Sequence, residues 1–255
     1  MLDSLKLAIQ FLTRIPVHLA QPPSERAIGR ALLWYPLVGL LYGVVLVSVA
    51  ILLDHLTPMG LSVTESFVVS ALVLLLWVML SGALHLDGLG DSADAWLGGG
   101  DRERTLAIMK DTHAGTGALV SVALVLLLKW SALQHLLLNQ QYLALLLAPL
   151  WARTSVLVLF ATTPYVRPNG LGASFSRYCE TRELWAITVI TLASIVTLFG
   201  GQGAALVLVA GGLFWCCRRL MVRRIGGTTG DTAGALIEVT EMAILVAAVF
   251  IVRMS

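Results

Sequence analysis

The sequence has few charged residues and few cysteines for its length. Only 13% of its 255 residues are charged, 58% are hydrophobic, and the mean hydropathy is +0.86. Soluble domains are about one quarter charged, so this composition excludes an ordinary water-soluble domain and predicts a protein of the lipid bilayer. The net charge of +2 is too small to indicate a nucleic-acid partner. The three cysteines show no paired spacing, which excludes a disulfide framework.

The N-terminal segment does not resemble a cleavable signal, because charged residues interrupt its apolar stretch. Its apolar residues instead recur every three or four positions, at Leu2, Leu5, Ile9 and Leu12. This spacing predicts a short amphipathic helix at the membrane surface, within residues 1–16 and ended by Pro16.

Long apolar stretches predict an all-α fold, a polytopic transmembrane helical bundle of about seven spans. We expect one integral membrane domain over residues 1–255. Ser62 and Glu65 predict a capping box at the second span, and Gly39 and Gly43 form a GxxxG motif that favours close helix packing. The predicted spans are residues 31–53, 66–84, 118–138, 142–163, 184–200, 203–221 and 233–252.

Lys and Arg occur in every other connection between these spans. They are found in the N-terminal segment and in residues 85–117, 164–183 and 218–232, and they are missing from residues 54–65, 139–141 and 200–203. Basic connections stay on the cytoplasmic side, so we expect an integral protein of the cytoplasmic (inner) membrane whose N-terminus faces the cytoplasm. Two acidic segments, 85–117 and 226–241, then share that side, and residues 85–117 and 218–232 are the expected active-site segments.

The first acidic segment carries three carboxylates, Asp87, Asp91 and Asp94, at spacings i, i+4 and i+7. On a helix these positions fall within about 60° of one another, so the side chains leave one face and repel each other. Such oxygen ligands suit Mg²⁺ or Mn²⁺, and the alternative is a solvated face without a metal. His85 beside them is either a proton carrier or a structural hydrogen-bonding residue.

Further polar residues precede the third span. Lys110 is a candidate to balance phosphate charge, and Asp111 is a candidate metal ligand or base; the alternative for both is a helix end or solvated loop. Gly115 and Thr116 are candidates for close contact with a phosphate. We interpret His113 as an ordinary histidine next to the membrane and not as a catalytic residue.

The second acidic segment contains a Gly/Thr-rich loop that runs into the last span. A loop of this kind at a helix N-terminus offers N–H groups and hydroxyls to a phosphate, but it lacks the lysine of a P-loop, which excludes an ATPase of that type. Asp231 is a candidate metal ligand or a simple N-cap, and Glu238 is a functional candidate because it is ionisable inside a span. The candidate phosphate-binding residues of the loop are Gly227, Thr228, Gly230 and Thr232.

Together these features predict a metal-dependent phosphotransferase of the membrane, in which protein and metal position the reactants and neutralise charge. Neither a Ser–His nor a Cys–His pair has a spacing that indicates acyl transfer.

Several motifs resemble those of the cobalamin-5′-phosphate synthase family, also called adenosylcobinamide-GDP ribazoletransferase. They are residues 85–94, 109–116 and 227–232, with residues 11–16 and 35–39 similar to the N-terminal hallmarks of the family. Ala95 and His113 stand where the family usually has Gly and Arg.

The resemblance implies that a ribose hydroxyl of α-ribazole, or of its 5′-phosphate, attacks the phosphate attached to cobinamide. GMP leaves, and adenosylcobalamin or its 5′-phosphate is formed with Mg²⁺ as the required cofactor. The implied metal ligands are Asp87, Asp91 and Asp94, with Asp231 sharing the site. The implied partners are adenosylcobinamide-GDP, α-ribazole and the lipid bilayer.

Two alternatives remain at this stage. A CDP-alcohol phosphatidyltransferase also uses helical aspartates, but Asp91 and Ser92 follow Gly88 where that signature has Ala-Arg. A cation-coupled transporter would place its carboxylates at the midplane of the membrane and show internal repeats. The carboxylates of this sequence instead cluster at one side of the membrane, and no repeat is visible.

Overall fold

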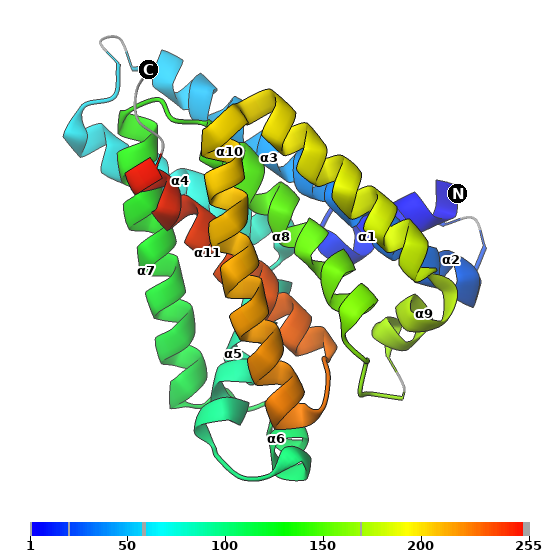
Figure 1. Cartoon of the computed structure of the whole chain (residues 1–255). Coiled ribbons are helices and arrows are strands. Elements are labelled where there is room, and N and C mark those ends of the chain that lie inside the picture. The colour runs from blue at the N-terminus through cyan, green and yellow to red at the C-terminus, as the bar shows by residue number, and fades with distance from the viewer. Residues whose placement is uncertain (1, 20, 58–59, 169, 252–255) are drawn as a thin grey trace.

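The computed structural model describes residues 2–19, 21–57, 60–168 and 170–251. Within those residues the regular elements are helices (Figure 1), and one isolated β-bridge pairs Tyr165 with Thr228 in the connections between them. This confirms the predicted all-α bundle. Met1 and Val252, which bound the predicted first and last segments, lie outside the described residues, as do the remaining C-terminal residues of the predicted domain.

Over the ranges that the structure describes, the helices follow one another without a sheet between them. They are α1 (Leu2–Leu12), α2 (Glu25–Arg30), the 3-10 helix η1 (Ala31–Trp34), α3 (Tyr35–His55), α4 (Val63–Ser81), α5 (Leu84–Leu97), α6 (Arg102–Ile108), α7 (Thr116–Leu138), α8 (Leu143–Thr162), α9 (Leu171–Tyr178), α10 (Thr181–Ile225) and α11 (Gly230–Ile251). In the described part of the chain, six helical stretches are long and apolar enough to cross a membrane: Glu25–His55, α4, α7, α8, α10 and α11.

Helix α10 accounts for two of the predicted spans. It has 45 residues, and a straight helix of that length would extend roughly 68 Å, about twice the thickness of a hydrocarbon core. Gly200 interrupts it with φ 54° and ψ −140°, a conformation that favours glycine. The chain reverses there, at the end of the bundle opposite α6 (Figure 1). The predicted spans 184–200 and 203–221 therefore form the two arms of one broken helix.

The start and stop signals around α4 are clear in the sequence. Ser62 Oγ accepts a hydrogen bond from Glu65 N at 3.2 Å, and the Glu65 carboxylate accepts one from Ser62 N at 2.8 Å, which confirms the predicted capping box. Gly82 and Ala83 both have φ of 60° and turn the chain. The predicted span 66–84 is thus corrected to Val63–Ser81, and the acidic ridge belongs to the separate helix α5.

The core forms around α8, the most buried of the membrane-spanning helices, which packs against α3, α10 and α11. On α3, Gly39 and Gly43 face the backbone of α8. A Cβ added at Gly43 would lie 2.7 Å from the carbonyl oxygen of Leu146, and one added at Gly39 would meet that of Pro149. The predicted role of the GxxxG motif in helix packing is confirmed.

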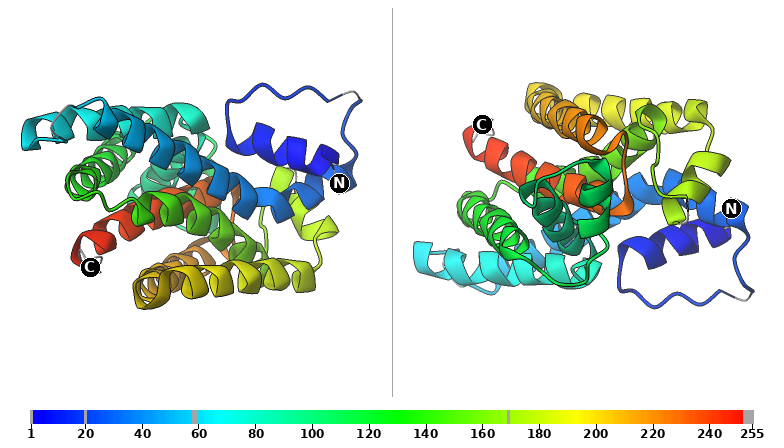
Figure 2. Two further views of the ribbon diagram at one scale, coloured as in Figure 1. Left: turned by 90° about the horizontal axis from the view of Figure 1, so that it is seen from above. Right: turned by 90° about the horizontal axis from the view of Figure 1, so that it is seen from below.

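Helix α1 is amphipathic as predicted, but it ends at Leu12, before Pro16. Leu7 and Leu12 are buried in the main hydrophobic core, whereas Leu2 is 66% exposed. The buried face of α1, which includes Leu7 and Leu12, packs against α2, η1 and α3 at the side of the bundle (Figure 2). The predicted position of α1 at the membrane surface stays a prediction.

The connections sort to opposite ends of the bundle. The three basic connections contact one another, as the alternation of Lys and Arg leads one to expect, and connections 54–65 and 139–141, which lack Lys and Arg, meet elsewhere. The contacts among the basic connections are Arg102 Nε to the Ile225 carbonyl (2.8 Å) and Val166 N to the Thr228 carbonyl (3.0 Å). The contact between the two connections without Lys or Arg is Gln140 Nε2 to Asp54 Oδ2 (3.0 Å).

We expect Gly43→Ala to lower the thermal stability of the detergent-solubilised protein, because the added methyl group meets the α8 backbone. Overpacking of this kind costs about 1–3 kcal/mol. The matched control is Gly212→Ala, since a Cβ at Gly212 meets nothing within 4 Å. The control should melt at or slightly above the wild-type temperature; equal melting temperatures for the two variants would contradict the packing argument.

Candidate active site

Helices α5 and α11 approach each other closely through two glycines. A Cβ added at Gly88 of α5 would lie 2.7 Å from the backbone oxygen of Asp231, and one added at Gly234 of α11 would lie 3.4 Å from the Cα of His85. This close approach places the start of α5, which carries Asp87, beside the first turn of α11. Two acidic segments far apart in the sequence therefore meet at one place, as their shared side predicts.

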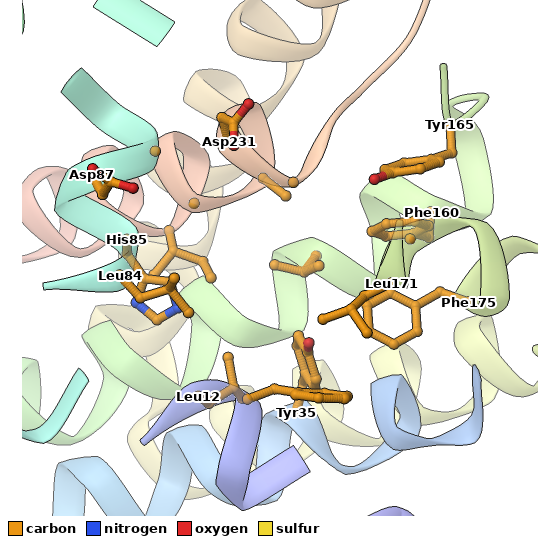
Figure 3. A pocket seen from close by; sticks show the side chains of 18 residues that line it. Leu12, Tyr35, Leu84, His85, Asp87, Phe160, Tyr165, Leu171, Phe175 and Asp231 are labelled. Atoms are coloured by element: carbon orange, nitrogen blue, oxygen red, sulfur yellow. The ribbon is translucent and has the colours of Figure 1, made fainter. Parts of the chain in front are cut away.

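The two helices border a cavity of about 260 Å³ (Figure 3). One part of its wall is polar and carries Asp87, Asp231 and His85. The other part is aromatic and aliphatic, from α1, α3, α8 and α9. The lining residues are Phe11, Leu12, Tyr35, Leu84, His85, Asp87, Gly88, Val156, Phe160, Tyr165, Leu171, Gly172, Phe175, Gly230, Asp231, Ala233, Gly234 and Ile237.

The carboxylates of the ridge affect one another electrostatically. The pKa of Asp91 is raised from 3.8 to about 6, first by burial and then by the negative charges of Asp87, Asp231 and Asp94, with Arg167 acting in the opposite direction. A raised pKa means that the ionised form of Asp91 lacks compensating positive charge. The predicted repulsion within the ridge is therefore present in the folded protein.

Asp94 has a structural role that the spacing did not predict. Its Oδ2 accepts a hydrogen bond from Gly115 N at 2.6 Å, and its Oδ1 accepts one from Ala118 N at 2.9 Å. The N-cap residue of α7 is Gly115, which has no side chain to accept hydrogen bonds from the first N–H groups of the helix. The Asp94 carboxylate accepts them instead. A Cβ at Gly115 or Gly117 would lie within 2.8 Å of the Asp94 carboxylate, so these glycines make room for it. The predicted metal role of Asp94 and the phosphate role of Gly115 stay predictions.

The segment after α6 lies at a second, more open hollow on the other side of Asp94. Asp111 and Thr116 line it, whereas Lys110 is exposed and does not. Asp111 accepts hydrogen bonds from His113 N at 3.0 Å and from His113 Nδ1 at 2.7 Å, and these bonds lower the pKa of Asp111. Lys110, Asp111 and Thr116 therefore do not line the cavity that contains Asp231, and the roles predicted for them stay predictions.

The Gly/Thr-rich loop is held by its own hydroxyls and by a neighbouring loop. Thr228 and Thr232 are buried and lie 2.9 Å apart at their hydroxyl oxygens. Thr228 N donates to the Pro164 carbonyl at 2.9 Å, and a Cβ on Gly227 would collide with that carbonyl. Gly230 alone of the four candidate phosphate contacts lines the cavity. The loop residues Gly227, Thr228 and Thr232 thus build the turn, and their predicted phosphate contacts stay untested.

Arg167 is a site residue that the sequence did not single out. Its guanidinium pairs with the Asp231 carboxylate at 2.7 Å, and it also donates to the Met109 carbonyl at 3.4 Å. Arg167 thereby joins the connection after α8 to both acidic segments. It appeared in the sequence only as one of several basic loop residues, and no spacing marked it as the partner of Asp231.

His85 lies in the cavity wall and is only 4% exposed. Burial lowers the pKa of His85 well below its usual range, and the positive charges of Arg153 and Lys129 act in the same direction, so its ring is neutral. Among the described residues, its Nδ1 has no hydrogen-bond partner. A buried polar atom without a partner costs free energy unless a ligand or water satisfies it.

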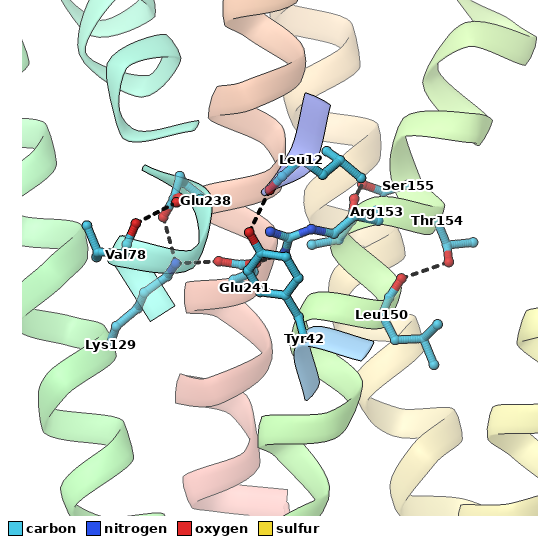
Figure 4. A network of polar contacts seen from close by, with 12 residues as sticks. Leu12, Tyr42, Val78, Lys129, Leu150, Arg153, Thr154, Ser155, Glu238 and Glu241 are labelled. Carbon is cyan, nitrogen blue, oxygen red and sulfur yellow. Dashed lines mark hydrogen bonds and ion pairs between the residues drawn. The ribbon is translucent and has the colours of Figure 1, made fainter. Parts of the chain in front are cut away.

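Behind the cavity, four ionised side chains form a buried network (Figure 4). Lys129 Nζ lies 2.6 Å from Glu238 Oε2 and 2.5 Å from Glu241 Oε2, and Arg153 pairs with the other oxygen of Glu241. All four are at most 4% exposed, and their formal charges cancel. Glu238 therefore does not line the cavity, and its predicted catalytic role stays a prediction. The sequence signal for Lys129 and Arg153 was a charge within an apolar span.

The carboxylates also bear on the predicted metal. In the residues that the structure describes, no group of three or more His, Cys, Asp or Glu side chains is preassembled to hold a metal ion. Asp87 and Asp231 nevertheless line one cavity, and Asp91 beside them has uncompensated charge. Mg²⁺ usually binds one or two protein carboxylates and takes its other ligands from water and substrate phosphates. The chemistry of these residues would suit a Mg²⁺ ion shared with a phosphorylated substrate, and the Mg²⁺ requirement stays a prediction.

We expect Asp91→Asn to raise the melting temperature at pH 7 in EDTA. The folded pKa of Asp91 is raised to about 6, so its ionisation destabilises the folded state as the pH rises from about 4 to about 6. The variant cannot ionise and escapes this loss. Its advantage over the wild type should shrink as the pH falls from 6 towards 4, and an advantage that does not change with pH would contradict the electrostatic cause.

Lys129→Met should destabilise the protein by about 3–5 kcal/mol, since it leaves Glu238 buried without a cation. The double variant Lys129→Met/Glu238→Gln restores charge balance, because Arg153 still pairs with Glu241. Unfolding in a denaturing detergent titration should show that the double variant recovers most of the loss. A double variant as unstable as the single one would show that charge balance is not the cause.

The chain is similar to known proteins over nearly its full length. The cobalamin-5-phosphate synthase family model matches residues 4–249. The adenosylcobinamide-GDP ribazoletransferase of Pseudomonas paraeruginosa is 52% identical over 248 residues, which cover 96% of this chain and 97% of the relative. Proteins of the same name from Pseudomonas fluorescens and Pseudomonas putida are 49% and 52% identical over 241 residues, 94% of this chain and 96% and 95% of the relatives. No solved structure matches the chain significantly.

These matches favour neither the phosphatidyltransferase nor the transporter alternative. They extend over nearly the full length of the chain, and they include both acidic segments and the loops that carry Arg167 and Asp231. The chain therefore belongs to the cobalamin-5-phosphate synthase family.

Proposed function

We propose that this protein is a membrane-bound adenosylcobinamide-GDP ribazoletransferase that requires Mg²⁺. A ribose hydroxyl of α-ribazole, or of its 5′-phosphate, attacks the phosphorus attached to cobinamide. The new P–O bond forms as the bond to the leaving phosphate of GMP breaks, and the hydroxyl proton passes to a base. The product is adenosylcobalamin or its 5′-phosphate. Relatives about 50% identical carry this name, which supports the assignment.

One observation carries the proposal: Asp87 and Asp231 line a single cavity, with Arg167 paired to Asp231 beside it. Phosphoryl transfer needs reactants held in line and negative charge neutralised, with little covalent chemistry from the protein. Two carboxylates, a guanidinium and the N-terminus of α11 at Gly230 provide groups for both tasks.

The two carboxylates differ in their surroundings. Asp231 is held by Arg167, whereas the Asp87 side chain makes no hydrogen bond or ion pair with any residue that the structure describes. We therefore assign Asp87 to accept the hydroxyl proton at a carboxylate oxygen, and Asp231 and Asp91 to hold Mg²⁺ with the phosphate oxygens. The ion, when bound, neutralises charge on the transferred phosphate and on the leaving group. Arg167 keeps Asp231 oriented and adds positive charge at the edge of the cavity.

The orientation in the membrane forms part of the proposal. The basic connections meet at the end of the bundle that carries the cavity, and connections 54–65 and 139–141, which lack Lys and Arg, meet at Asp54 and Gln140. Because Lys and Arg are retained on the cytoplasmic side, the site and the N-terminus face the cytoplasm of the inner membrane. Water-soluble substrates then reach the cavity directly.

The test is an assay of the protein in lipid nanodiscs with adenosylcobinamide-GDP, α-ribazole and Mg²⁺. GMP and a cobalamin should form together, and excess EDTA should abolish both. Asp87→Asn and Asp231→Asn should each lower kcat at least about 100-fold, the scale of losing a general base or a charge-neutralising contact.

The control for these variants is Asp54→Asn, which changes a carboxylate at the opposite end of the bundle and should keep wild-type activity. Full activity of Asp87→Asn or Asp231→Asn would reject the assigned site. A wild-type protein that forms no cobalamin from these substrates would reject the proposed reaction.

A further inference from the structure

The cavity beside Asp87 has an aromatic wall opposite its carboxylates (Figure 3). Phe160 and Phe175 pack edge to face with ring centroids 5.4 Å apart, and Tyr35 packs edge to face on Phe175 at 5.8 Å. Tyr165 stacks on Phe160 at 5.9 Å with an interplanar angle of 23°. Because four rings from three parts of the chain hold one another, the wall is rigid and suits a flat aromatic ligand.

The volume of the cavity limits what it accepts. At about 260 Å³ it lies just below the usual range of small-molecule pockets, about 300–1,000 Å³. A corrin ring with its side chains and nucleotide is several times larger than a nucleoside and does not fit inside. A single nucleoside does. Of the two substrates in the proposed reaction, only the acceptor fits the cavity as a whole molecule.

His85 supplies an independent sign of a polar ligand. Its side chain is 4% exposed and lines the cavity, and its Nδ1 has no partner among the described residues. A purely apolar occupant, such as an acyl chain, would leave that nitrogen unsatisfied. An occupant with an aromatic ring and a hydrogen-bonding edge satisfies both the wall and His85.

We propose that this cavity is the binding site of the acceptor nucleoside, with its heteroaromatic base against Phe160 and Phe175 and a polar edge hydrogen-bonded to His85 Nδ1. The ribose hydroxyl then faces Asp87 and Asp231, and the corrinoid donor approaches from outside the cavity. The proposal rests on the proposed function, because it assigns a place to one of the two substrates. It makes the aromatic wall the determinant of which base is accepted.

Steady-state kinetics with each substrate varied separately test the proposal. Phe160→Leu and Phe175→Leu should each raise the KM for α-ribazole about tenfold, since each removes an aromatic ring that stacks on the base while Leu keeps part of the apolar contact. The KM for adenosylcobinamide-GDP should stay within about twofold. Phe214→Leu is the matched control, because Phe214 lines a separate apolar cavity between α8 and α10 and should change neither KM.

His85 is tested by a pair of substitutions. His85→Leu removes the hydrogen bond and should raise the KM for α-ribazole at least about tenfold, whereas His85→Asn keeps a polar atom near the Nδ1 position and should recover most of the affinity. Melting temperatures close to that of the wild type will show that each variant is folded. Equal defects in the Leu and Asn variants would reject the hydrogen bond.

Direct binding separates this proposal from the proposed function. Equilibrium dialysis of radiolabelled α-ribazole against wild-type nanodiscs without donor should show binding that Phe160→Leu weakens and Phe214→Leu does not. If the wild type forms cobalamin but the Phe160 and Phe175 variants change only the donor KM, or neither KM, the cavity assignment is wrong while the function stands. If no cobalamin forms at all, the function itself fails.

Discussion

Gly88 allows α5 and α11 to approach until the backbone of one nearly touches the other, and the location of the chemistry depends on this contact. A Cβ at this position would lie 2.7 Å from the Asp231 carbonyl, so any larger residue would separate the helices. The contact places Asp87 and Asp231 on one cavity and leaves His85 in its wall. Arg167, from a third segment, pairs with Asp231 and joins the neighbouring loop to the same place.

Behind this contact, a buried ion network holds α11 in place. Lys129 from α7 and Arg153 from α8 hold Glu238 and Glu241, and isolated charges at such depth would be costly. The Arg153 guanidinium carbon lies 4.6 Å from the centroid of the Tyr42 ring. The Tyr42 hydroxyl donates a hydrogen bond to the Leu12 carbonyl at 2.6 Å, and Tyr42 thereby connects the network to the end of α1. The network thus supports both the helix that carries Asp231 and a wall of the cavity.

Residues whose roles depend on local spacing were predictable. The apolar stretches gave the spans, Ser62 and Glu65 gave the start of α4, and Gly39 and Gly43 gave a close helix contact, because each signal acts within a few residues. The boundary between α4 and α5 was missed, since it depends on two left-handed residues that apolar composition does not reveal. The predicted short spans 184–200 and 203–221 correspond to the two arms of α10, which is interrupted at Gly200.

By itself, the sequence determined that the chain lies in a membrane, that its basic connections share one end, and that Asp87, Asp91 and Asp94 form one ridge. Composition, charge alternation and helical periodicity encode these features directly. Only the tertiary structure decided which polar residues meet: Asp231 with Arg167, Asp94 with the start of α7, and Glu238 with Lys129. Pairing across helices depends on how side chains of distant segments pack, and no spacing along one segment carries that information.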